Sequence, residues 1–365
     1  MSTQSKNIIL KIVIIIVSVY LFLLGIKLLG HSFKLFGGGF ATTMLTLTDN
    51  PFSGLLIGII ATSLIQSSST TTSIVVGLVA GGALTLPNAI PIVMGANIGT
   101  TITNTLVSMG HITNKIEFKR AFSAAIVHDF FNICAVVVLF PIEYYFHIIQ
   151  KTSKLAEVWF EGIGGLKLFN PLKFILNPVI DLIDSLLVYI PFSNFILLLF
   201  AGVLLFGSLT YLIKTIRSLV LNKLEIFINN YLFRNDLFAF TFGIIVTAIV
   251  QSSSITTSLI IPLAGAGLIT IRQLFPYTMG ANIGTTITAM LAALATQNQI
   301  AVMVAFSHLS FNIFGIIIFY PLKNIPIRLA EFVGEKAAIS TKNLVIFLGL
   351  YLCIYFVPII FIVLL

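Results

Sequence analysis

Two polar segments each occur twice in this chain, at one fixed spacing. The stretch Gln66-Ser-Ser-Ser-Thr-Thr-Thr-Ser73 returns as Gln251-Ser-Ser-Ser-Ile-Thr-Thr-Ser258, and the decapeptide Met-Gly-Ala-Asn-Ile-Gly-Thr-Thr-Ile-Thr occupies both 94–103 and 279–288. The offsets, 251 − 66 and 279 − 94, are both 185. The chain therefore consists largely of two related halves, and its fold has to accommodate two copies of one polar site.

Both copies lie inside strongly apolar sequence. Of the 365 residues, 58% are hydrophobic and only 9% are charged, and the mean hydropathy is +1.09. A soluble globule of this size needs more polar surface, so the composition predicts an all-α integral membrane protein in a lipid bilayer. Hydroxyls and amides are costly in hydrocarbon unless they line a cavity or bind something, and paired broken segments are typical of a transporter site.

The ends and charges of the chain fit this class. The first apolar run, about 8–29, is longer than the core of a signal peptide and does not end in a small-residue cleavage site, so we expect a retained transmembrane helix. The net charge of +8 comes from basic residues at the ends of apolar runs, which indicates loop charges and no nucleic-acid partner. Cys134 and Cys353 fall in apolar helical stretches, where we expect them to pack as small hydrophobes.

Repeat one, residues 1–140, is predicted to begin with a span near 8–30 and an interfacial piece to about 50. Two arms of about 15 residues then flank a polar tip at 66–73, and each arm is too short to cross a bilayer. Such arms predict a re-entrant hairpin, with its tip in protein or in a water-filled cavity. An unwound helix interrupted at 95–101 and a span near 121–140 complete the repeat.

Repeat two, residues 193–320, shows the same order of elements. It comprises a span near 193–213, a hairpin with its tip at 251–258, an unwound helix at 280–286 and a span near 301–320. Residues 141–192 form an amphipathic connector that we expect to lie along the external membrane surface; an ordinary long loop is the alternative. Residues 321–365 form a linker and a C-terminal transmembrane helix near 344–365.

The two repeats are predicted to have opposite orientations in the membrane. Each has three full crossings, because a re-entrant hairpin returns to its own side, and an odd number inverts the next copy. Loop charges agree with this topology. Lys115, Lys119 and Arg120 outweigh Glu117 and indicate a cytoplasmic loop, whereas the connector carries four lysines and five acids and is predicted to be external.

The hairpin tips carry the donors that a phosphate-like anion needs. Helix N-termini, exposed backbone N–H groups and hydroxyls all bind oxyanions, and two tips can converge on one ligand. Neither tip contains Arg or Lys, so the anion's charge has to be offset by dipoles and by cations bound with it, which favours a cation-coupled carrier. The predicted anion-binding residues are Gln66, Ser67, Ser68, Ser69, Thr70, Gln251, Ser252, Ser253 and Ser254.

Sodium is bound by carbonyl, hydroxyl and amide oxygens, which unwound segments supply. Asp129 is an ionisable carboxylate inside an apolar span and predicts a cation site; the second copy has Leu309 at that position, and a structural Asp near a helix end is the alternative. The other predicted sodium ligands are Asn97, Thr100, Thr101, Asn282, Thr285, Thr286, Gln66 and Gln251. We expect His128, Asn132, His308 and Asn312 to stand behind these ligands without touching the ions.

A packing role is the alternative for all these polar residues. Ser, Thr, Gly and Asn also let transmembrane helices approach closely without binding any ligand. The duplication at a fixed spacing favours a binding site over packing alone.

The chain resembles the type II sodium-dependent phosphate cotransporters, and specifically their prokaryotic members. The resemblance spans nearly the whole chain. It is carried by the paired tips, the two Gly-Ala-Asn-Ile-Gly-Thr-Thr segments, Phe118-Lys-Arg-Ala-Phe, Val127-His-Asp-Phe-Phe-Asn132, Phe275-Pro-Tyr-Thr-Met-Gly280 and Ile325-Pro-Ile-Arg-Leu-Ala330. Unlike animal members, this chain has a short connector without cysteines in place of a large disulfide-bonded extracellular loop.

The resemblance implies sodium-coupled import of inorganic phosphate across the plasma (inner) membrane by a multi-pass protein that is not an enzyme. It implies that the tips help to form the phosphate and sodium sites, and that an Asp at position 129 makes transport electrogenic. Beyond the transported Na⁺ and phosphate, we expect no cofactor. The sequence does not specify an oligomeric state.

Three other functions compete with this interpretation. A carrier on the same scaffold could take another oxyanion, such as sulfate or arsenate, or a dicarboxylate. An intramembrane serine hydrolase would use Ser67, Ser68 or Ser69 with His128 or His308, but the chain has no Gly-x-Ser-x-Gly elbow and the duplicated tips would imply two nucleophiles. A channel-like or structural membrane protein would show no flux driven by a sodium gradient.

Overall fold

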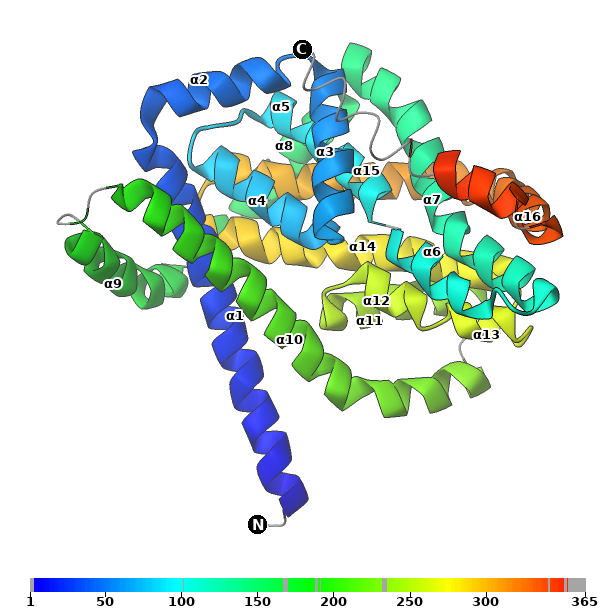
Figure 1. Ribbon diagram of the computed structural model, residues 1–365. Helices are drawn as coiled ribbons and strands as arrows, with labels where there is room; N and C mark the ends of the chain where they lie inside the picture. The colour runs from blue at the N-terminus through cyan, green and yellow to red at the C-terminus, as the bar shows by residue number, and fades with distance from the viewer. Residues whose placement is uncertain are drawn as a thin grey trace.

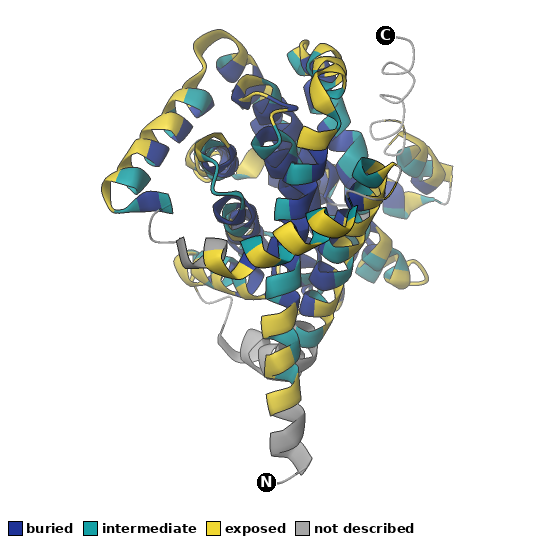
Figure 2. Cartoon of the chain, turned by 90° about the vertical axis from the view of Figure 1, so that its left-hand side faces the viewer, coloured by how far each residue is buried: buried dark blue, intermediate teal, exposed yellow. Residues whose placement is uncertain are grey.

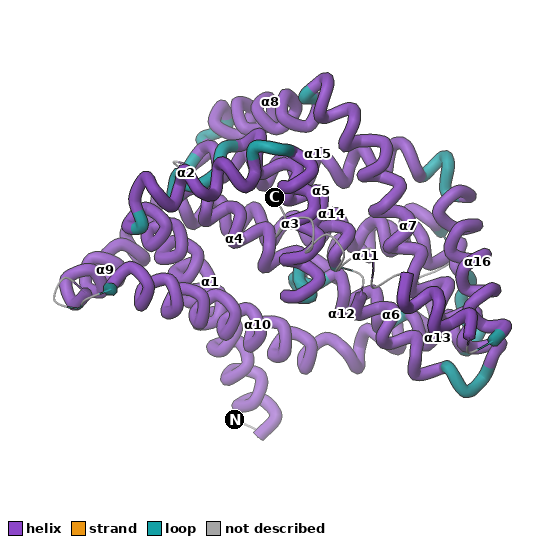
Figure 3. Tube along the Cα trace, turned by 45° about the horizontal axis from the view of Figure 1, so that its top comes forward, coloured by secondary structure: helices purple, strands orange, loops and turns teal. Residues whose placement is uncertain are grey.

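The computed structural model describes residues 3–100, 102–166, 170–187, 190, 192–231, 235–340, 342–350 and 353. Within these residues the chain is helical and has no strand (Figures 1 and 3). The helices are α1 Thr3–Leu35, α2 Gly37–Thr48, α3 Pro51–Ile65, α4 Ser68–Ala80, α5 Leu86–Gly99, α6 Ile102–Ser108, the short 3₁₀ turn η1 Met109–His111, α7 Lys115–Phe146, α8 Ile148–Gly162, α9 Asn170–Leu187, α10 Ser193–Tyr231, α11 Asp236–Val250, α12 Ser253–Ser258, α13 Ile261–Gly265, α14 Ile271–Thr296, α15 Gln299–Phe319 and α16 Asn324–Ile339. The predicted all-α fold is confirmed.

Six described helical stretches are long and apolar enough to cross a membrane. They lie in α1, α5 with α6, α7, α10, α14 and α15, and α2 with α3 would add a seventh if their 100° bend counts as one span. Four of them match the spans predicted near 8–30, 121–140, 193–213 and 301–320. Residues 344–350 of the predicted C-terminal helix are helical, and most of its remainder lies outside the described residues. The protein is therefore a multi-pass membrane protein.

Burial separates a central group of helices from a peripheral one. The apolar windows of α5–α6 and α14 are 81% and 78% buried, whereas those of α1 and α10 are each 33% buried. Exposed apolar side chains such as Ile16 and Val203 cover the outside of α1 and α10, and Figure 2 shows the buried residues gathered inside the body of the molecule. In a bilayer, lipid would cover such a surface.

Two helix–turn–helix segments correspond to the predicted hairpins, whose re-entrant course in the membrane stays a prediction. The first consists of α3 and α4, of 15 and 13 residues, and the second of α11, with 15 residues, followed by the short α12 and α13. The turns have the same backbone: Gln66 and Gln251 are left-handed at φ 57°, and Ser67 and Ser252 are extended at φ −152°. The repeated sequence thus produces a repeated turn, although none of the arms is long enough to span.

The bases of the hairpins lie at opposite ends of α7. Pro51 and Pro87, at the base of the first hairpin, line a small cavity with Phe140 near the C-terminal end of α7. The loop 267–271, at the base of the second, lines another cavity with Arg120 near the N-terminal end. Inverted repeats require hairpins that approach from opposite ends, and the opposite orientation of the two repeats in the membrane stays a prediction.

The predicted unwound helix at 280–286 is wrong. Helix α14 runs without interruption from Ile271 to Thr296. In the first repeat α5 is helical through Gly99 and ends at Thr100, so most of the segment predicted to be unwound at 95–101 is helical, and Thr101 lies outside the described residues. The glycines serve close packing instead. A Cβ at Gly280 would lie 2.0 Å from the Phe240 carbonyl oxygen, and one at Gly95 would lie 2.0 Å from that of Leu55.

The connector predicted at 141–192 is mostly helical. Helix α7 continues past the expected boundary to Phe146, and the amphipathic helices α8 and α9 follow. Helix α8 packs on α15, and α9 is joined to α1 where His31 meets Asp184 at 3.0 Å. Cys134 and Cys353 are both free thiols.

Candidate functional site

The two hairpin tips meet each other and the end of α5. The Ser69 hydroxyl donates to the backbone carbonyl of Gln251 at 3.3 Å, and the Ser254 hydroxyl donates to that of Thr100 at 3.0 Å. The Thr100 carbonyl is available because α5 ends there and leaves its last carbonyls without helical partners. Serines of both repeats thus lie close together, and their convergence on one bound anion stays a prediction.

The predicted anion-binding residues of the tips differ in their exposure to solvent. Ser68, Ser69, Thr70, Ser253 and Ser254 are all at most 5% exposed. Gln66 is exposed, whereas Gln251 is buried. The repeats therefore share a backbone turn but differ in how far their glutamines reach solvent.

The first serine of each tip caps a helix. The Ser67 hydroxyl accepts from the Thr70 backbone N–H at 3.2 Å, and the Ser252 hydroxyl accepts from that of Ile255 at 3.4 Å. An N-cap satisfies one N–H of the first turn and leaves others directed away from the helix. The tips thus present two capped helix N-termini, with buried serines in their first turns.

A polar network joins two predicted sodium ligands, Asn97 and Asn282, to residues that were expected to stand behind the ligands. His128 Nε2 lies 2.6 Å from Asn282 Oδ1, Asn282 Nδ2 donates to Asn132 Oδ1 at 2.7 Å, and Asn132 Nδ2 donates to the Asn97 carbonyl at 2.7 Å. On the other side, His308 Nε2 lies 3.4 Å from Asn97 Oδ1. All five residues are at most 3% exposed. The structure thus brings four elements, α5, α7, α14 and α15, together through side chains predicted from the repeat.

The predicted threonine ligands keep their hydroxyl hydrogens in the helix. Those of Thr100, Thr285 and Thr286 donate to backbone carbonyls three or four residues earlier, at 2.9, 3.0 and 2.7 Å. A hydroxyl that donates still has lone pairs for a cation. Asn312 differs from its counterpart Asn132, because its amide donates to the His308 carbonyl of its own helix at 3.0 Å.

Asp129 is 2% exposed in the middle of α7. One turn earlier, Ala125 packs against Ile261 of α13, with Val107 of α6 beside it. This face of α7 therefore looks toward the second hairpin. Among the described residues no group of three His, Cys, Asp or Glu side chains could hold a metal, so a cation here would rely on neutral oxygens and a single carboxylate, ligands that suit hard cations.

One polar pair was missed by sequence reasoning. Asn104 of α6 and Thr257 of α12 are hydrogen-bonded at 2.9 Å from amide nitrogen to hydroxyl, and both are buried. Thr257 lies in the second polar segment, but Asn104 directly follows the duplicated decapeptide and its counterpart is Ala289. The sequence signal that could have identified this pair is that Asn104 is polar whereas its repeat counterpart is not.

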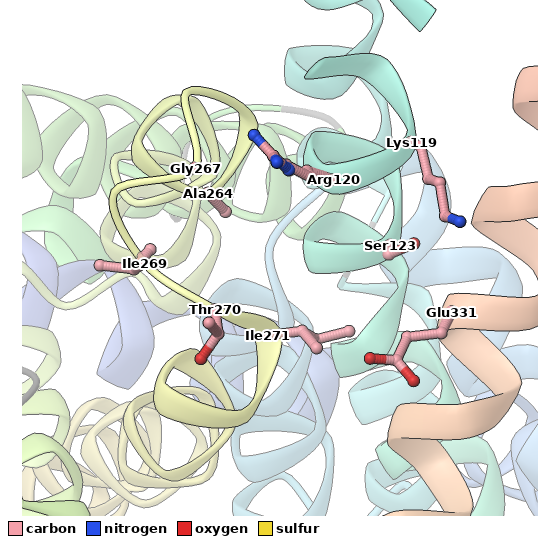
Figure 4. A pocket seen from close by; sticks show the side chains of 9 residues that line it. All are labelled: Lys119, Arg120, Ser123, Ala264, Gly267, Ile269, Thr270, Ile271 and Glu331. Carbon is pink, nitrogen blue, oxygen red and sulfur yellow. The ribbon is translucent and has the colours of Figure 1, made fainter. Parts of the chain in front are cut away.

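Several basic side chains lie at the base of the second hairpin. A cavity of about 280 Å³ is lined by Lys119, Arg120 and Ser123 of α7, Glu331 of α16 and the loop before α14 (Figure 4). At the same base, Lys323 binds Asp236 at 2.7 Å, and the hydrogen bond from this ammonium lowers the pKa of the Asp236 carboxyl. These charges stabilise the base of the hairpin, whereas the tips contain no basic residue.

Comparisons with known proteins identify the family of this chain. The Na⁺/Pi-cotransporter family model matches residues 21–166 and 203–325. Sodium-dependent phosphate transport protein 2A of Rattus norvegicus is 34% identical over 406 residues, covering 90% of this chain and 64% of that protein. Sodium-dependent phosphate transport protein 2B of Homo sapiens is 32% identical over 424 residues, covering 90% and 61%. No solved structure matches the chain significantly.

The chain thus spans slightly less than two thirds of the length of these curated relatives. The matched ranges include both hairpin tips and all of α5, α7, α14 and α15. The chain belongs to the Na⁺/Pi-cotransporter family.

Proposed function

We propose that this protein imports inorganic phosphate across the plasma (inner) membrane, driven by the inward sodium gradient. The observation that carries the proposal is the convergence of the two tips, with Ser69 bound to the Gln251 carbonyl and Ser254 to the Thr100 carbonyl. The names of the mammalian relatives, sodium-dependent phosphate transport proteins, fit both ions.

The anion would be bound by the tips. Partial positive charge at the N-termini of the second arms, together with first-turn N–H groups and the hydroxyls of Ser68 and Ser253, suits a phosphate oxyanion. Because the tips contain no Arg or Lys, dipoles alone would leave most of the anion's charge uncompensated. Cations bound with the anion would supply the remainder, and so couple the two fluxes.

Sodium would be bound by the oxygens beside the tips. The proposed ligands belong to the segments that follow the two tips in the sequence. They are the hydroxyls of Thr100, Thr285 and Thr286 and the amides of Asn97 and Asn282, from the C-terminal end of α5 and from α14. Gln66, Gln251 and Thr101 stay in the predicted ligand set. Asp129 would hold the additional ion that makes the cycle electrogenic.

Alternating access would move the two hairpins with α5–α6 and α14. The buried hydrogen bonds from α7 and α15 to Asn97 and Asn282 tie those helices to the same unit. The peripheral helices α1 and α10, which pack against each other, would form the part against which this unit slides or rocks. The exposed Gln66 and the buried Gln251 suit a site that opens beside one tip at a time.

Uptake into proteoliposomes tests this function. Labelled phosphate should accumulate against its gradient when sodium is higher outside, and the accumulation should stop when potassium replaces sodium. Sulfate and dicarboxylates should not compete, whereas strong competition by one of them would favour a different anion as the substrate. Phosphate flux that ignores the sodium gradient would contradict the proposal and favour a channel.

Asp129→Gly should abolish phosphate-evoked current while some electroneutral uptake continues. With three sodium ions per divalent phosphate, each cycle carries one net positive charge, assisted by roughly 2.3 kcal/mol per 100 mV of inside-negative potential. Removing the carboxylate would remove the third ion and this voltage dependence. Recording current and labelled uptake from the same proteoliposomes checks the result, and an undiminished current would exclude Asp129 as a cation site.

The hydrolase alternative gains no support from the geometry. A serine nucleophile needs a base within hydrogen-bonding reach. The Nε2 atoms of His128 and His308 bind asparagine side chains, and the Ser67 hydroxyl caps α4. We therefore propose a carrier and no enzymatic activity.

A further inference from the structure

The histidine and asparagine pairs of the two repeats are exchanged. His128 of repeat one binds Asn282 of repeat two, and His308 of repeat two binds Asn97 of repeat one. Within the chain, Asn97 and Asn282 are repeat partners 185 residues apart, and the two histidines are partners 180 residues apart. Each imidazole therefore contacts the amide of the opposite repeat, across the interface between the halves.

The direction of these hydrogen bonds is fixed by backbone carbonyls. Asn132 donates to the Asn97 carbonyl, so its Oδ1 accepts from Asn282 Nδ2, and Asn282 Oδ1 then has to accept from His128. In the other pair, Asn97 Nδ2 donates to the Val93 carbonyl at 2.9 Å, so Asn97 Oδ1 accepts from His308. A carbonyl can only accept, so both imidazoles carry their hydrogen on Nε2.

The same tautomer leaves Nδ1 as an acceptor in both rings. Among the described residues, neither His128 Nδ1 nor His308 Nδ1 has a hydrogen-bond partner, and both atoms are buried. Among the described residues, the hydrogen bond that orients each ring is therefore the one made by Nε2. Substitution by Gln can keep a donor near that atom, whereas substitution by Ala cannot.

We propose that His128 and His308 are positioning residues that orient the cation-binding amides of the opposite repeat. An amide oxygen has two lone pairs, so Asn282 Oδ1 and Asn97 Oδ1 can each accept from a histidine and still bind a cation. Groups that orient a ligand in this way commonly change ion affinity 10- to 100-fold when removed. The cation-binding amide of one repeat is therefore oriented correctly only while the histidine of the other repeat is in contact with it. This inference rests on the proposed function, because it assigns Asn97 and Asn282 to sodium.

Transport kinetics test the pairing. His128→Ala should raise the KM for sodium by about tenfold and change the KM for phosphate at saturating sodium by less than about twofold, while His128→Gln should recover most of the sodium affinity. The effect of His128→Ala should disappear in an Asn282→Ala background and persist in an Asn97→Ala background, since only the first pair is bonded. His308→Ala should show the reverse dependence. The proposal would be overturned if the changes in sodium KM were additive in every double variant, or if they were coupled between a histidine and an asparagine of the same repeat.

A spectroscopic measurement separates this inference from the proposed function. In protein labelled with ¹⁵N-histidine, the signals lost in His128→Gln and in His308→Gln should show a protonated Nε2 and a non-protonated Nδ1. Asn282→Ala should shift the His128 signals and leave those of His308, whereas Asn97→Ala should do the opposite. A ring protonated on Nδ1 would overturn the exchange even if sodium drives phosphate uptake. If the spectra are as predicted but sodium does not drive phosphate uptake, the exchanged hydrogen bonds would be confirmed and the proposed function would be wrong.

Discussion

Gly280→Val is expected to destroy the folded protein. The added Cβ would lie 2.0 Å from the Phe240 carbonyl oxygen and 3.1 Å from the Ile244 backbone nitrogen, so α14 and α11 would have to separate along their whole contact. Backbone atoms cannot turn away as side chains can, and the cost should reach about 3 kcal/mol or more, the upper range for overpacking. The loss of folded protein is measured in detergent by heating samples to a series of temperatures and quantifying the remaining monodisperse protein by size-exclusion chromatography.

Gly202→Val is the matched control, because nothing lies within 4 Å of a Cβ at that position on α10. Its melting temperature should equal that of the wild type. Gly95→Val should fail as severely as Gly280→Val, since its Cβ meets the Leu55 carbonyl oxygen at the same 2.0 Å. A stable, monodisperse Gly280→Val protein would mean that α11 and α14 do not pack as closely as described.

Ser254→Ala should lower sodium-driven phosphate uptake by about fivefold or more. It removes the hydroxyl that joins the second tip to the Thr100 carbonyl, and an unsatisfied buried carbonyl costs about 1–3 kcal/mol. Each 1.4 kcal/mol is a factor of ten. Initial rates in proteoliposomes, at matched amounts of folded protein, measure the effect, and Ser69→Ala should behave similarly because its hydroxyl binds the Gln251 carbonyl.

The control for Ser254→Ala is Ser258→Ala in the same helix. The Ser258 hydroxyl donates to the Ile255 carbonyl of its own helix at 2.9 Å, so its loss breaks no contact between elements. Uptake by this variant should stay within about twofold of wild type. Equal losses in Ser254→Ala and Ser258→Ala would show that the contact between the second tip and the Thr100 carbonyl has no special role.

The repeated local features were predictable from the sequence. The left-handed Gln66 and Gln251, and the extended serines that follow them, depend on neighbouring residues, so identical segments produced identical turns. The hairpin arms followed from their length, and the all-α membrane fold followed from the apolar runs. Convergence of the tips was also predictable, because a duplicated polar site in hydrocarbon is stable only if its copies are enclosed.

Features that depend on a distant partner were not predictable. The Gly280 segment suggests an unwound helix when considered alone, and only its contact with Phe240 shows that the glycine permits close packing. Likewise, nothing in the spacing of His128 indicates that its partner is Asn282, 154 residues away. Such pairings are decided by the three-dimensional arrangement of the two halves.

Locating a bound oxyanion tests whether the two tips form one shared anion site. Arsenate is an electron-rich analogue of phosphate, and its arsenic can be placed by anomalous scattering in crystals grown with sodium. The proposed site predicts one arsenic peak between the two tips, within hydrogen-bonding reach of 66–70 and 251–254, and loss of that peak when potassium replaces sodium. A peak only in the basic cavity beside Lys119 and Arg120, or one indifferent to sodium, would contradict a shared site at the tips.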